Sequence, residues 1–109
     1  MAYTNRISWE PLRTFNAASL NGSFQSIGVP LANPSYILKM VNNSTSLVTI
    51  SIDGVTAIDV CPANSYWLYD EDTSGNPTPE GIPEGTQIFV NGSAGTGNIY
   101  VVSQYIVRN

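Results

Sequence analysis

Histidine is absent from this chain of 109 residues, and cysteine occurs once, as Cys61. Without histidine, neither a catalytic triad with an imidazole base nor a histidine-based metal site can form. A single cysteine also excludes a zinc ribbon, a cysteine cluster and a disulfide within the chain. Because Cys61 has no histidine to activate it, we interpret it as a small buried apolar side chain.

Charged side chains are also scarce. Four basic residues stand against eight acidic ones, for a formal net charge of −4. The basic residues are scattered singly, so no basic stripe can follow a phosphate backbone or an anionic lipid surface. The apolar runs are only a few residues long, which predicts neither a signal peptide nor a membrane span. We therefore expect a product of the cytoplasm with no nucleic-acid partner and no membrane partner.

The length allows one domain, residues 1–109, with an adequate core. No stretch shows a convincing helical stripe, and a period of two dominates instead. Within 47–53, Val48, Ile50 and Ile52 alternate with polar residues, as in a strand with one face toward water. Asp53-Gly54 follows directly, and this dipeptide favours a type I′ turn. We therefore predict a tight hairpin between strands at 47–53 and 55–60.

Similar β-rich runs recur along the rest of the chain. They lie at 36–41, 65–69, 86–90 and 98–107, and shorter candidates lie in the first third. Turn residues separate them at intervals of 8–12 residues, which is typical of sandwiches and jelly rolls. The predicted fold class is all-β: a single-domain β-sandwich or jelly roll of seven to nine short, mostly antiparallel strands.

The two ends of the chain hold apolar side chains that one small domain has difficulty covering. The last predicted strand, 98–107, is apolar on both faces, so it lies at the centre of its sheet or its second face meets another subunit. Residues 1–12 include Tyr3, Ile7 and Trp9 and are expected to form an extended N-terminal arm. Such an arm packs on its own domain or crosses to a neighbour, which favours a homo-oligomer.

Aromatic residues cluster at 65–69. Alternation places Tyr66 and Leu68 on one face of this strand and Trp67 and Tyr69 on the other. One pair fills the core, and the other is exposed to a protein partner or stacks on a sugar ring. We favour a protein partner, and the predicted interface residues are Tyr3, Ile7, Trp9, Trp67, Tyr69, Tyr100 and Tyr105.

The acidic residues offer two weaker alternatives. Asp70, Asp72 and Gly75 match the first half of a calcium loop, but Gly81 stands where the closing glutamate belongs, and we predict no metal site. The carboxylates of a glycosidase could come from Glu10, Asp53, Asp59, Glu80 and Glu84. Each of these has a simpler role in a turn or on a wet strand face, so we predict no catalytic residue, no cofactor and no enzymatic activity.

From residue 36 to residue 105, about two-thirds of the chain, the sequence resembles small structural proteins of tailed-bacteriophage virions. The resembling segments are ILKMVNN (37–43), VTISIDGV (48–55), PANSY (62–66), PEGTQIFV (83–90) and GTGNIYVV (95–102). The resemblance implies a β-sandwich or jelly-roll module located in the virion, where it acts as a capsid cement or decoration protein, or as a neck or tail component. Its expected partners are the major capsid protein or other virion proteins. The alternative is a tail- or fibre-associated module that binds a receptor or a carbohydrate.

Overall fold

The computed structural model describes residues 6–70 and 82–107. Among these residues it contains nine strands and one short 3-10 helix. They are β1 (Arg6–Trp9), β2 (Arg13–Asn16), η1 (Ala17–Ser19), β3 (Gln25–Ser26), β4 (Ile37–Ser44), β5 (Val48–Ser51), β6 (Asp59–Cys61), β7 (Ser65–Asp70), β8 (Phe89–Asn91) and β9 (Gly97–Val107).

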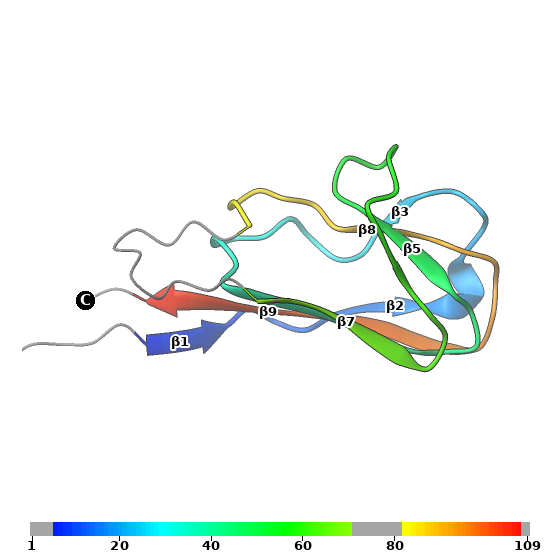
Figure 1. Ribbon diagram of the computed structural model, residues 1–109, viewed down its shortest axis with the longest axis horizontal. Coiled ribbons are helices and arrows are strands. Elements are labelled where there is room, and N and C mark those ends of the chain that lie inside the picture. The colour runs from blue at the N-terminus through cyan, green and yellow to red at the C-terminus, as the bar shows by residue number, and fades with distance from the viewer. Residues whose placement is uncertain (1–5, 71–81, 108–109) are drawn as a thin grey trace, which may run out of the picture.

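The strands form two antiparallel sheets that lie in two layers (Figure 1). Sheet A has the order β1-β9-β4-β7, and β2 also pairs with β9. Sheet B has the order β3-β8-β5-β6. The prediction of an all-β sandwich is confirmed. Of the two alternatives for the last strand, the structure shows the central position, because β9 lies between β4 on one side and β1 with β2 on the other.

The pairing of strands is nested along the sequence. β5 pairs with β6, β4 with β7, β3 with β8, and the outermost pair joins β1 and β2 to β9. The chain therefore behaves as one long hairpin whose successive pairs fall alternately into sheet B and sheet A. Two further pairings, β4 with β9 and β5 with β8, complete the two sheets.

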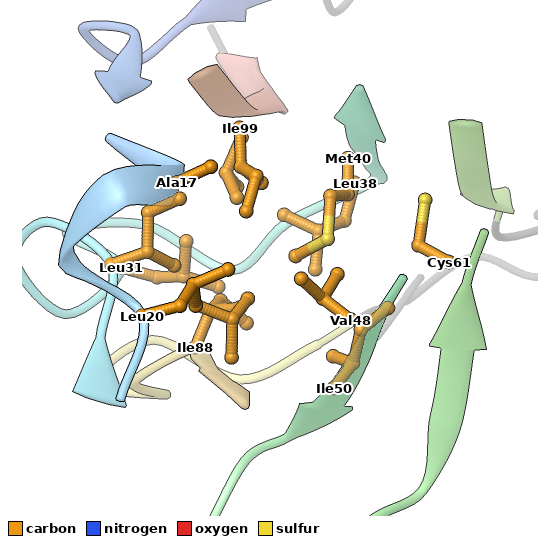
Figure 2. Close-up of a cluster of buried hydrophobic side chains, with 13 residues drawn as sticks. Ala17, Leu20, Leu31, Leu38, Met40, Val48, Ile50, Cys61, Ile88 and Ile99 are labelled. Carbon is orange, nitrogen blue, oxygen red and sulfur yellow. The ribbon is translucent and has the colours of Figure 1, made fainter. Parts of the chain in front are cut away.

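The core lies between the inner faces of the two sheets (Figure 2). On β4 the burial alternates, with Leu38 and Met40 buried and their neighbours only half-buried. Val48 and Ile50 of β5 enter the same core from sheet B. Their alternation is the pattern that the sequence showed, and each fully buried aliphatic side chain stabilises the fold by about 1.5–3 kcal/mol. Cys61 is part of this core, as predicted.

The edge formed by β1 and β2 contains a β-bulge. Trp9 pairs with Gln104, whereas Arg13 pairs with Val101, so this edge has one residue more than β9 between the two pairs. The backbone N–H of Glu10 still donates to the carbonyl oxygen of Ser103, at 3.0 Å. Residues 6–9 pair with β9 as strand β1 of sheet A, and residues 1–5 lie outside the described residues.

The tight Asp53-Gly54 hairpin was predicted wrongly. β5 ends at Ser51, β6 begins at Asp59, and the residues between them form a wider loop. Gly54 does adopt a positive φ of 79°, but Asp53 does not. Instead the carboxylate of Asp53 accepts hydrogen bonds from the backbone N–H groups of Val55 and Thr56, both at 2.8 Å. This side-chain turn satisfies the backbone locally and replaces the ladder of a type I′ hairpin.

Candidate interaction surface

The candidate site is the face of sheet A that points away from sheet B, hereafter the outer face. Cross-strand pairs share a face, so the registers of β1, β4, β7 and β9 determine which side chains meet there. Its described members are mostly apolar or aromatic. They are Ile7, Trp9, Ile37, Lys39, Val41, Asn43, Tyr66, Leu68, Asn98, Tyr100, Val102, Gln104 and Ile106, and Thr14 and Asn16 of β2 lie at the edge of the same face.

Several of these side chains are strongly exposed. Trp9 is 60% exposed, Tyr66 is 66% exposed and Leu68 is 50% exposed. Single exposed apolar residues are ordinary, but a contiguous apolar surface across four neighbouring strands is not. In an antiparallel sheet with one solvated face, that face is normally polar. The outer face therefore has the composition of a contact surface.

One positive charge lies near the middle of this surface. Lys39 pairs with Val102 on one side and with Leu68 on the other, so apolar side chains flank it in both directions. Lys39 is the only charged residue among the outer-face positions whose side chains the structure describes; Asp70, which pairs with Ile37 at the end of β7, is not among them. The single ion pair found in residues 6–70 and 82–107 joins Arg13 to Glu10, so Lys39 takes part in no ion pair there.

A shallow hollow of about 480 Å³ lies on the outer face next to Lys39. Tyr66 and Tyr100 both pair with Val41, so the two rings lie on either side of this smaller side chain. Asn43 and Asn64 contribute to the lining at one end. The hollow is open to solvent and offers aromatic walls, one ammonium group and amide groups.

The predicted interface residues separate into two groups. Ile7, Trp9 and Tyr100 lie on the outer face. Tyr105 pairs with Ser8 and therefore lies on the opposite face, and Tyr3 lies outside the described residues.

Trp67 and Tyr69 pack against the buried core instead of facing outward. Trp67 pairs with Met40, which is buried, and its indole N–H donates to the carboxylate of Asp59 across the gap between β7 and β6.

The other members of β7, Tyr66 and Leu68, occupy the exposed side. The period-two alternation separated these two pairs, but only the register of β7 on β4 shows which pair is inward. Lys39 and Val102 were likewise not singled out from the sequence.

Three of the candidate catalytic carboxylates, Glu10, Asp53 and Asp59, have structural partners, whereas Glu80 lies outside the described residues. Burial alone would raise the pKa of Glu10, but hydrogen bonds from Asn33, Arg13 and the backbone of Ala32, with the charge of Arg13, hold it below its usual range. Hydrogen bonds from the backbone of Thr56 and Val55 and from Ser51 lower the pKa of Asp53 to about 2. Neither shift suits a general acid, which needs a raised pKa.

The thiol of Cys61 has its pKa raised by burial, which is opposite to the change that activates a nucleophile. In the described ranges no group of three or more histidine, cysteine, aspartate or glutamate side chains lies close enough to hold a metal ion. Residues 71–81, which contain most of the calcium-loop motif, lie outside the described residues.

Comparison with protein-family models, curated proteins and solved structures gives no match to this chain. Across residues 6–70 and 82–107, the structure has no helix of the length and apolar character needed to cross a membrane. The geometry of the outer face is therefore the main basis for a functional assignment.

Proposed function

We propose that this protein is a non-enzymatic structural component of a tailed-bacteriophage virion and works through protein–protein contact. In its specific form, the proposal is a capsid cement or decoration protein that binds the major capsid protein. The observation that supports it best is the outer face of sheet A, which exposes Trp9, Tyr66 and Leu68 on a surface with one described charge. Aromatic enrichment and few charges are the composition of interface cores.

The strand order adds independent support. If β1 and β2 are counted as one interrupted strand, the nested pairs form two four-stranded sheets, each made of strands from both halves of the chain. We infer from this nesting that the sandwich is a jelly roll, an architecture that occurs in viral capsid proteins and in lectins. The same fold supports many functions, so this argument is secondary to the composition of the surface.

The proposal is tested on particles produced from a phage genome that encodes this chain. Gradient-purified virions should contain the protein in a fixed ratio to the major capsid protein, measured by quantitative mass spectrometry. Tyr66→Asp places a carboxylate on the outer face opposite the apolar Val41 and should reduce incorporation, because an unpaired charge at an interface is costly. Val55→Asp is the matched control, since Val55 is 80% exposed in the loop between β5 and β6 and away from this surface. Absence of the protein from purified particles would reject the assignment.

A carbohydrate-binding module is the second candidate, and the hollow beside Tyr66 favours it. Its sequence-based version required Trp67 and Tyr69 to be exposed, but these side chains pack on the core. Tyr66 and Tyr100, with the amides of Asn43 and Asn64, are the groups able to stack on and hydrogen-bond a sugar. A glycan array probed with the purified chain and with Tyr66→Ala tests this idea. Binding that requires Tyr66 supports it, and an array without specific signals excludes it.

A further inference from the structure

We propose that the outer face of sheet A binds the outer face of a second copy of this chain and forms a two-fold symmetric dimer. The inference rests on the proposed function only in treating this face as a protein interface. It assigns this face to a second copy, so a capsid protein would bind the dimer through its other surfaces, and it specifies the contacts that join the two copies.

The outer face contains both a projecting side chain and a hollow able to receive it. Trp9 is 60% exposed at the β1 edge, where it pairs with Gln104. The hollow lies where Tyr100, Val41 and Tyr66 are aligned across three strands. In a two-fold dimer the same contact occurs twice, so one surface must provide both halves of it. This surface meets that requirement.

The registers give the position of the symmetry axis. Trp9 and the hollow are separated by about four residues along β9 and by two strand spacings, which are about 14 Å and about 10 Å. The midpoint falls at Val102. The two-fold axis lies between the two faces, passes over Val102 and is perpendicular to the line from Trp9 to the hollow. Rotation about this axis places each Trp9 over the hollow of the other copy. The two sheets then cross at a large angle, as in orthogonal sheet packing.

The size of the surface limits the strength of such a dimer. Four strands over about nine residues cover about 19 Å by about 30 Å. Because the two sheets cross at a large angle, they overlap over about 19 Å by about 19 Å, so the two copies together bury about 700 Å². An interface of this size is typical of weak, transient contacts, so we expect a dissociable dimer rather than an obligate one.

Lys39 distinguishes this arrangement from binding to a different protein. It pairs with Val102 and so lies one strand spacing, about 5 Å, from the point over which the axis passes, which brings the two Lys39 side chains near each other. Like charges in this position weaken a dimer of identical copies. A different partner would instead be expected to offer a carboxylate to Lys39. Neutralising this residue therefore has opposite effects in the two cases.

Sedimentation equilibrium of the purified full chain, from about 1 µM to about 1 mM, tests the inference. A monomer–dimer equilibrium is expected, and Trp9→Ala and Tyr66→Ala should each weaken it by about tenfold or more. Because the two side chains contact each other across the interface, the double variant should lose less than the sum of the two effects. Lys39→Met should tighten the dimer severalfold, and the control Val55→Ala should leave it unchanged.

Circular dichroism shows whether each variant remains folded, and Trp9 and Tyr66 are exposed enough in the monomer for the substitutions to be tolerated. A chain that stays monomeric over the whole range, or a dimer that Trp9→Ala and Tyr66→Ala leave intact, overturns the inference. If the protein is monomeric and still enters virions, and if Lys39→Met reduces its incorporation, the dimer is rejected and the proposed function is supported. A dimer with the expected variant effects that is missing from particles supports the dimer and rejects the proposed function.

Discussion

Glu10 and Arg13 point into the same side of sheet A although they are three residues apart along its edge. In a regular strand such residues lie on opposite faces. The β-bulge between Trp9 and Arg13 adds one residue and brings both side chains inward. There a guanidinium N–H of Arg13 donates to the carboxylate of Glu10 at 2.8 Å, and both residues are buried.

This ion pair also anchors the loop that follows β3. Arg13 donates to the carbonyl oxygens of Val29 and Pro30, at 2.9 and 3.1 Å. The side-chain amide of Asn33 donates to the other carboxylate oxygen of Glu10, at 2.9 Å. The pair thus joins the edge of sheet A to the loop that leads into β4, and the following prediction measures this connection.

Removing one partner of the pair should be costly. In Glu10→Gln the buried guanidinium loses its counter-charge, so we expect the free energy of unfolding to fall by about 3–5 kcal/mol. Glu84→Gln, at an exposed site, is the control and should change it by less than about 0.5 kcal/mol. The double variant Glu10→Leu with Arg13→Met should recover much of the loss, because neither residue is then left charged and buried. Urea unfolding of the four proteins provides the values; a Glu10→Gln variant as stable as its control contradicts the prediction.

The protein should lose stability in acid. The folded-state pKa values of Glu10 and Asp53 lie below their ordinary values, so both carboxylates favour the folded state above about pH 5. That contribution declines as the pH falls through the ordinary values near 4 toward the folded pKa, which is about 2 for Asp53.

The midpoint of urea unfolding, measured between about pH 7 and about pH 2, should therefore decrease steadily below about pH 5. Glu10→Gln should show a shallower decrease because one of the two shifted groups is missing. An equal slope in the variant would remove Glu10 from this explanation.

Asn42 connects the two sheets through a buried amide group. It lies on the inner face of β4, and its side-chain N–H₂ donates to the carbonyl oxygens of Ser46, Cys61 and Pro62 at 2.8–3.1 Å. Asn42→Asp keeps the shape but directs a carboxylate at these acceptors, so we expect a loss of about 3 kcal/mol or more at pH 7.

The neighbouring Asn43 offers a matched control, because it is exposed and points to the other side of β4. Asn43→Asp introduces the same charge and should cost less than about 0.5 kcal/mol. Thermal unfolding of the two variants separates the loss of the donor from the added negative charge. Equal melting temperatures would show that the three hydrogen bonds contribute little.

Gly97 begins β9 with a φ of +100° and lies against the backbone of β4. A Cβ atom there would collide with the carbonyl oxygen of Asn43, which the sheet holds in place. Gly22 has a φ of +84°, but no atom lies within 4 Å of the place a Cβ atom would take, so it isolates the effect of the dihedral angle. We expect Gly22→Ala to cost about 1 kcal/mol and Gly97→Ala to cost about 1–3 kcal/mol more, as measured by urea unfolding. Similar losses at the two glycines would contradict the predicted collision.

The fold class was predictable because its determinants are local. Alternation at 47–53, the β-rich run at 98–107 and the spacing of turn residues indicated strands, and the structure places β5 and β9 in those stretches. The failure at Asp53-Gly54 is also local in origin. A side chain that accepts hydrogen bonds from Val55 and Thr56 competes with hairpin pairing, and dipeptide preferences do not include this competition.

The sequence by itself determined that this chain is built of strands, since a period of two is a property of neighbouring residues. Only the tertiary structure decided which side of β7 is inward and that Trp9, Lys39 and Tyr66 share one surface. Those relations depend on pairing between β4, β7 and β9, and β4 and β9 are separated by about half of the chain. A shift of one residue in that pairing would exchange Trp67 and Tyr66 between core and solvent. The energy that prevents the shift comes from the packed core as a whole, not from any one strand.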